Sequence, residues 1–409
     1  MKRLFLFILI VFWVFPTPIF AEAPLRLNAL IAQVLAQNPE ILAAQARRTS
    51  ARTRISQAMA LDDPEVALTQ WSFPSLNFLG ADETWLTLSQ KIPGWNKREI
   101  LGRLTATEWD IARIKVEEIE RRVVAETKSA YFDLFLAQKH LNIHQEQIDL
   151  AKEVKTLAQA RFAIGTIEQS DVLQTQMEIL ELESGHAALE RQREAVEAKI
   201  HALLSAHVPL DKTETLEVPE LTVSLDRLEE TAIAHQPELK LLSLLRQYST
   251  QKIAQARLGL TPDFMAEVAY MDIHHGKNAG MISLKMTLPW INRKKYLAGL
   301  REMHAESASA TAEYQAAVNK ARLAVKEFYI QWQNEKRRAE LYRFSMLPLA
   351  EQSFEATRVG YQAGTIDFFT LIAAGRALKD VKFKGFEALA AAYQAIAQLE
   401  QAIGQDLMP

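Results

Sequence analysis

The 409-residue sequence contains no cysteine, which excludes a disulfide framework, thiol chemistry and attachment of a lipid to a cysteine. Beyond the N-terminal region it also lacks any apolar run of the roughly 20 residues that a membrane-spanning helix needs. Any membrane crossing would therefore have to be made by β-strands. Packing and partners must hold this chain together.

The sequence also lacks a strong charge of either sign and the common catalytic motifs. A net charge of −3 with 24% charged residues argues against a disordered chain and against a broad nucleic-acid surface. There is no GxSxG turn, no phosphate-binding loop and no glycine-rich dinucleotide turn after a strand. We therefore predict a protein that is not an enzyme, needs no cofactor and binds no nucleic acid.

The first 21 residues have the pattern of a secretory signal. Lys2 and Arg3 precede an apolar run from Leu4 to Phe15, and the small residue Ala21 closes the segment. A run of about 12 residues is too short to span a bilayer as a helix. We expect residues 1–21 to be removed and the remainder to leave the cytoplasm.

Long proline-free stretches follow. Trp95 to Ala160 contains no proline, and its apolar residues keep the three, four and seven spacing of coiled-coil packing. As one helix, roughly 65 residues would span about 100 Å. A second long run extends from Trp290 to Arg358, and within it Pro348 predicts a bend near Leu347.

Two similar segments reveal an internal duplication. Residues 161–173 read RFAIGTIEQSDVL, and residues 360–371 read GYQAGTIDFFTL. In each, a glycine (Gly165 or Gly364) stands where a helix would end in a left-handed residue, so each segment predicts the tip of a helical hairpin. Further landmarks recur with an offset of about 196 to 199 residues, including Asn38-Pro39 with Gln236-Pro237. We predict a first repeat at 22–206, a linker at 207–223 and a second repeat at 224–409.

Each repeat also contains two short segments with alternating polarity. They are residues 64–73, 84–92, 264–272 and 281–288. In the second pair one face is apolar while the other carries Glu267, Ser283, Lys285 and Thr287. A half-buried hairpin of a soluble domain would give the same pattern.

Strand length, aromatic residues near the strand ends and export favour a membrane barrel instead. Four strands cannot close a barrel, and an open sheet edge is not stable in lipid, so several copies would have to pool their strands. Three copies would give about 12 strands and a polar lumen, whereas two would give about 8, too few for a water-filled channel. The expected fold is mainly helical, with four strands per chain in a trimeric barrel.

The duplicated order of helix, strand pair, long helix, tip and returning helix resembles the TolC-type outer-membrane efflux proteins. The chain is similar to members of that family that work with heavy-metal or cation exporters. The resemblance implies a homotrimer with a 12-stranded barrel in outer-membrane lipid and a tunnel of helices in the periplasm. It also implies two partners: a periplasmic adaptor (membrane fusion) protein, and an inner-membrane pump of the resistance-nodulation-division type.

Carried over by position, the resemblance implies tip residues that contact the adaptor. They are Arg161, Gly165, Ser170, Gly364 and Thr365. The second copy departs from the pattern, since Gly360 stands where arginine is expected and Phe369 lies near the serine position. The two tips are therefore not expected to engage an adaptor in the same way.

Two acids follow the tips. In a trimer, Asp171 or Asp367 would form a ring of three carboxylates that could select cations at a pore constriction. The alternative is that each acid only stabilises the N-terminus of its helix against the macrodipole. A metal site is a weaker candidate: His140 and His144 have the i, i+4 spacing of a ligand pair, but such pairs arise readily by chance in a helical chain.

The favoured function is a passive outer-membrane exit duct for metal cations or small toxic compounds. Two alternatives stay open. One is a periplasmic coiled-coil scaffold or adaptor whose strands form a small soluble domain. The other is a type I conduit that secretes polypeptides.

Overall fold

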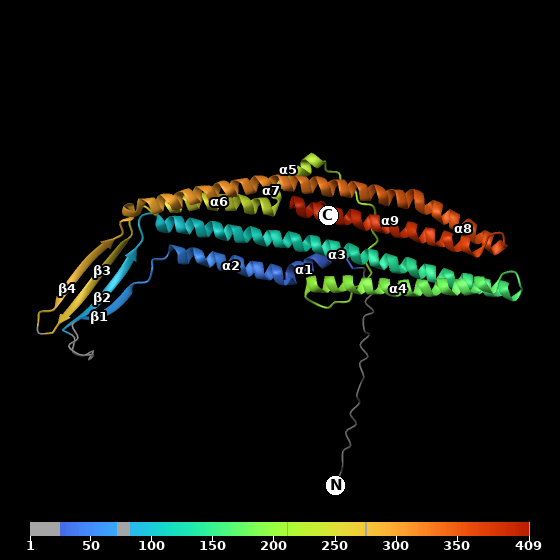
Figure 1. Cartoon of the computed structure of the whole chain (residues 1–409), viewed down its shortest axis with the longest axis horizontal. Helices are drawn as coiled ribbons and strands as arrows, with labels where there is room; N and C mark the ends of the chain where they lie inside the picture. The colour runs from blue at the N-terminus through green and yellow to red at the C-terminus, as the bar shows by residue number, and fades with distance from the viewer. Residues whose placement is uncertain (1–24, 72–81, 211, 275, 409) are drawn as a thin grey trace, which may run out of the picture.

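The computed structural model describes residues 25–71, 82–210, 212–274 and 276–408. The long axis of the molecule runs from a four-stranded sheet at one end to two helical tips at the other (Figure 1). Within the described residues, no helix combines the length and the apolarity that crossing a membrane requires.

The first half contains two short helices, two strands and a long hairpin. In order these are α1 (Leu27–Gln37), α2 (Pro39–Met59), β1 (Glu65–Trp71), β2 (Glu83–Ile92), α3 (Lys97–Ala163) and α4 (Gln169–Leu204). The proline-free stretch forms the 67 residues of α3 without interruption, about 100 Å of helix. Helices α2 and α4 pack on α3, one beyond the other along its length (Figure 1).

The second half repeats this order with one interruption. Its elements are α5 (Leu225–His235), α6 (Pro237–Leu258), β3 (Phe264–Ile273), β4 (Ala279–Met286), a 3₁₀ turn (Pro289–Asn292), α7 (Arg293–Leu341), a π-helical turn η3 (Tyr342–Met346), α8 (Leu347–Ala363) and α9 (Phe368–Ile403). The irregularity predicted near Leu347 thus lies at η3, just before that residue, and the helical path continues through Pro348.

The sheet is antiparallel with strand order β1-β2-β3-β4. The predicted alternation is confirmed: Val66, Leu88, Val268 and Ile282 are successive partners across the four strands. All four are exposed, from 51% for Leu88 to 86% for Ile282, so they form an apolar row on one open face. The opposite face carries Glu267, which pairs with Lys285. Neither β1 nor β4 pairs with a further strand within the described residues.

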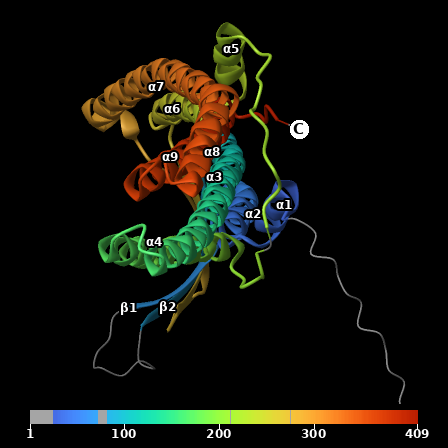
Figure 2. The same cartoon turned by 90° about the vertical axis from the view of Figure 1, so that its right-hand side faces the viewer.

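The main core lies at mid-length, where the halves meet. Tyr131, Phe132 and Leu134 of α3 are buried there. Phe135 of α3 packs with Ala339 of α7 and with buried residues of α9. Viewed along the long axis, α3 lies between the elements of the two halves (Figure 2).

The segment between the halves packs across this core. The backbone N–H of Thr213 donates to Gln138 at 2.9 Å, and that of Glu214 donates to the hydroxyl of Tyr131 at 3.1 Å. Leu216 packs against the cores that contain Tyr131 and Phe135. Although its sequence has little periodicity, the segment is therefore fixed to α3.

Candidate gating tips

The two hairpin tips share one backbone geometry. Gly165 and Gly364 have φ values of 74° and 82°, the left-handed conformation that their sequence context predicted. In the first tip Thr166 N–H donates to the carbonyl of Arg161 at 3.0 Å, and in the second Thr365 N–H donates to the carbonyl of Gly360 at 3.0 Å. The duplicated motif therefore encodes the same helix ending twice.

The tips differ in side-chain chemistry, and a single arginine joins them. Arg161 Nη2 donates to the carbonyl of Gln362 at 2.9 Å, and its guanidinium lies 4.9 Å from the centre of the Tyr361 ring. A Cβ added to Gly360 would lie only 2.6 Å from Cδ1 of Ile366. The missing arginine of the second tip is thus explained: glycine makes room for Ile366 there, and Arg161 spans both tips.

Tyr361 was not singled out from the sequence, although its contacts place it at the centre of the tip region. Its ring is buried against Val154, Phe368 and Leu371. Burial raises the pKa of its hydroxyl, which has no hydrogen-bond partner within the described residues. The one sequence signal for Tyr361 is that an aromatic residue stands at this position in both copies of the motif, with Phe162 in the first copy.

The two predicted acids occupy different positions. Asp367 is the N-cap of α9, where its carboxylate accepts from Thr370 N–H at 2.8 Å and from the Thr370 hydroxyl at 3.1 Å. The hydrogen bond from the Thr370 backbone is the main cause of its lowered pKa. Asp171 lies in the first turn of α4 and is half-buried, on the side of Tyr361. Both acids thus lie where a carboxylate stabilises a helix N-terminus, Asp367 as the N-cap of α9 and Asp171 in the first turn of α4, whose N-cap is Glu168.

Ser170 and Thr365, the other predicted contact residues, are exposed at the tips. The Ser170 hydroxyl lies 3.3 Å from Glu168, and the Thr365 hydroxyl donates to the carbonyl of Gly360 at 3.0 Å. With the exposed Gly165 and Gly364, they form the end surface of the molecule.

A further link between the hairpins lies behind the tips, between α4 and α9. Arg376 of α9 binds both carboxylate oxygens of Glu178 on α4 and lies 3.3 Å from Glu181. The hydrogen bond that Arg376 donates to Glu178 raises the pKa of Arg376. Glu178 is buried while the Arg376 side chain is 54% exposed, so this charge-assisted pair joins the hairpins at the edge of the helix packing. No sequence pattern indicated it, because the partners are 198 residues apart.

The predicted histidine pair lies inside the helix packing. The His140 ring stacks on Phe383 at 4.0 Å, with its Nε2 3.9 Å from Glu387, and His144 lies near His186 of α4. Burial lowers the pKa of both His140 and His144. Among the described residues, no group of three or more His, Asp or Glu side chains could hold a metal ion.

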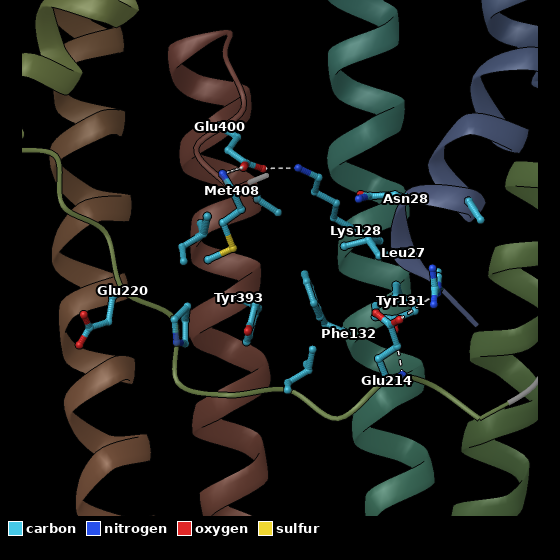
Figure 3. Close-up of a pocket in the computed structure, with 16 residues that line it drawn as sticks. Leu27, Asn28, Lys128, Tyr131, Phe132, Glu214, Glu220, Tyr393, Glu400 and Met408 are labelled. Carbon is cyan, nitrogen blue, oxygen red and sulfur yellow. Dashed lines mark hydrogen bonds and ion pairs between the residues drawn. The ribbon is translucent and has the colours of Figure 1, made fainter. Parts of the chain in front are cut away.

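A cavity of about 650 Å³ lies at mid-length and is crossed by a buried ion pair (Figure 3). Lys128 Nζ of α3 lies 2.5 Å from Glu400 of α9, whose other oxygen accepts from the N–H groups of Leu407 and Met408. The pair therefore joins the two halves and fixes the C-terminal segment. It is structural, and lies far from the tips, since Lys128 is 35 residues before Ala163, the last residue of α3, and Glu400 is near the opposite end of α9 from its tip.

Comparisons with known proteins agree with this geometry. The chain is 23% identical over 401 residues to the cobalt-zinc-cadmium resistance protein CzcC of Cupriavidus metallidurans, covering 94% of this chain and 91% of that protein. Its fold matches a structure of CusC with a TM-score of 0.79 and 15% identity, covering 93% and 92% of the two chains. It matches VceC from Vibrio cholerae with a TM-score of 0.77 and 16% identity, covering 93% and 97%.

The family model described as outer membrane efflux protein matches residues 30–206 and 228–405, nearly all of both halves. Its members are efflux proteins of the outer membrane, not enzymes, and their helical part lies in the periplasm. This match, together with the four-stranded sheet and the paired helical hairpins, shows that the chain belongs to the outer membrane efflux protein family.

Proposed function

We propose that three copies of this chain form the outer-membrane duct of a tripartite efflux system that exports metal cations. The observation that carries the proposal is the sheet: an exposed apolar row crosses all four strands, and both edge strands, β1 and β4, are open within the described residues. Open edges are not stable in lipid, and pooling the strands of three copies gives about 12, enough for a water-filled lumen.

Disulfide cross-linking tests the trimer directly, because the chain has no cysteine background. Ile282→Cys on β4 is combined in turn with single cysteines along β1, including Val66→Cys, in outer membranes. We expect a ladder of cross-linked species that ends at the trimer. The matched control combines Val66→Cys with Val268→Cys on the inner strand β3, which should give no ladder. A ladder that ends at the dimer, or none for any pair, contradicts the proposal.

We propose further that the tips form the gate and bind the adaptor. Arg161 joins the two hairpins of one chain, while Asp171 and Asp367 lie beside the same tips and would form rings of carboxylates in a trimer. An adaptor that contacts the tips more favourably in the open state would shift the equilibrium toward opening. Ser170, Thr365 and the two tip glycines provide the exposed end surface for that contact.

Conductance across lipid bilayers tests the gate. Asp171→Asn with Asp367→Asn removes both charges while an asparagine at 367 still caps α9. We expect a higher conductance or a weaker preference for cations, and Arg161→Ala should raise conductance by releasing the contact between the tips. Asp380→Asn, on α9 away from the tips, serves as the control. Unchanged conductance and selectivity in both tip variants would exclude these residues from the gate.

The proposed cargo rests on the relative whose name states cobalt, zinc and cadmium resistance. Deleting the gene in its host should increase sensitivity to at least one of these cations and should raise the metal content of the cells. If the protein were instead a polypeptide conduit, the deletion should remove a secreted protein from the culture supernatant and leave metal sensitivity unchanged. The pump is proposed to be of the resistance-nodulation-division type, which co-purification through the adaptor would test.

A further inference from the structure

A second, smaller cavity lies beside the π-helical turn, apart from the tips and from the mid-length ion pair. It has a volume of about 250 Å³ and is bounded by α3, α9, η3 and the segment between the halves. Its apolar wall includes Val218, Leu347, Phe386 and Leu389, and its polar wall includes Lys139 and Arg343. It therefore contacts elements of both halves.

The cavity lies where the helix changes its winding. Leu347 N–H donates to the carbonyl of Tyr342, five residues earlier, which widens the turn, and Pro348 next to it has no N–H to donate. Gly385 of the facing helix lies against this turn, where an added Cβ would come into van der Waals contact with Cβ of Tyr342 at 3.4 Å. The corresponding part of α3 is uninterrupted, so this feature is specific to the second half. Such turns frequently occur at functional sites.

The charge in this cavity is one-sided. Three of its lining residues are basic and, among the described residues, none is acidic. Lys382 is neutralised by Glu146 at 2.9 Å. Within the described part of the chain, Lys139 and Arg343 form no ion pair, and their charged groups lie near aromatic rings instead. Lys139 Nζ lies 5.4 Å from the Phe135 ring and 5.5 Å from the Phe386 ring, and the Arg343 guanidinium lies 5.5 Å from the Phe344 ring.

We propose that this cavity binds a small amphipathic anion, with its apolar body against Phe386 and Leu389 and its carboxylate or sulfonate between Lys139 and Arg343. Two cations that lack a carboxylate beside an apolar wall are complementary to such a ligand. The volume equals that of about eight water molecules, which suits a bicyclic aromatic or medium-chain carboxylate and is too small for a drug-sized compound.

The site is tested by titrating the full-length protein in non-ionic detergent with 2-naphthoate. Binding is measured by saturation-transfer nuclear magnetic resonance. The neutral 2-naphthamide has the same apolar body and serves as the comparison ligand. We expect the carboxylate to bind about tenfold more tightly than the amide, because only the carboxylate can pair with the two cations. Equal binding of the two compounds, or no binding of naphthoate at millimolar concentration, overturns the proposal.

Three variants separate this site from non-specific adsorption. Lys139→Met with Arg343→Met keeps the apolar stems and should weaken naphthoate binding about tenfold while the amide is unaffected. Val218→Trp fills the cavity from the linking segment and should abolish binding of both ligands. Arg338→Met removes one positive charge nearby on α7, where Arg338 pairs with Glu335, and should change nothing. Circular dichroism establishes that each variant is folded. Wild-type affinity in the double variant or in Val218→Trp contradicts the assignment.

Discussion

The two halves follow the same path but hold it by different interactions. In the first half, α3 is one uninterrupted helix, and Asn38 caps α2 by accepting from Glu40 N–H at 2.9 Å. In the second half, a π turn divides α7 from α8, and Gln236 makes no side-chain cap at the start of α6. The duplication has thus preserved the backbone while the local contacts have diverged. The first half is the more regular frame, and the second half contains the irregular helix.

The tips extend this comparison. Their backbones are alike, but only the first supplies an arginine and only the second supplies a buried tyrosine for it to cover. A symmetric pair of tips would need two such contacts. Instead, Arg161 alone makes both the hydrogen bond to Gln362 and the contact with the Tyr361 ring, so the tips are not independent units.

The largest predicted effect on stability comes from removing Glu400, whose ion pair joins the two halves. Glu400→Ala should lower the free energy of unfolding by about 3 to 5 kcal/mol, because it leaves the buried ammonium of Lys128 without its main partner. The carboxylate of Asp406 lies 3.6 Å from Lys128 and remains as a second partner, so we expect a loss toward the lower end of this range. Denaturant titration followed by circular dichroism measures the change.

The double variant Lys128→Met with Glu400→Met is the control for this prediction. With both charges replaced by apolar side chains of similar length, the loss should be clearly smaller than for Glu400→Ala alone. If the single and double variants were equally destabilised, the ion pair would not be the cause.

A smaller effect should distinguish the two helix starts. Asn38→Ala should cost about 1 to 2 kcal/mol, since it removes the cap of α2 and also the donor to the carbonyl of Leu203 at 3.0 Å. Gln236→Ala, at the matched position, should cost only a few tenths of a kcal/mol, because no side-chain cap is lost. Equal losses in thermal or denaturant unfolding would show that the halves are stabilised alike at this point.

The sequence predicted the elements whose signals are local. The absence of proline predicted α3, the alternation of residues 264–272 predicted the exposed face of β3, and the two tip glycines predicted the left-handed helix ends. Residues 72–73, at the end of the first expected strand, lie outside the described residues.

The contacts between the halves could not be predicted in this way. Arg376 with Glu178 and Lys128 with Glu400 join residues 198 and 272 positions apart. Their pairing depends on the register of packed helices, which no periodicity encodes. Likewise, the sequence predicted an irregularity at Pro348 but not its form, because the missing N–H of a proline does not decide between a bend and a π turn.

The smallest predicted effect concerns pH and the histidines on α3. Burial lowers the pKa of His140 and His144 in the folded protein, and Lys379 of α9 and His186 of α4 act in the same direction on His144, whereas Glu387 of α9 opposes it at His140. In the unfolded chain these histidines take up a proton near the ordinary value of about 6.5. Stability is therefore fully present above that pH and falls as the pH drops below it, because the unfolded state then binds more protons.

We expect the thermal midpoint of the wild type to drop by a few degrees more between pH 7.5 and 5.5 than that of His140→Phe with His144→Phe. The exposed His304 on α7 of the second half provides the comparison, and His304→Gln should follow the wild type. If all three proteins lost the same number of degrees, the buried pair would not contribute to the acid sensitivity of the first half.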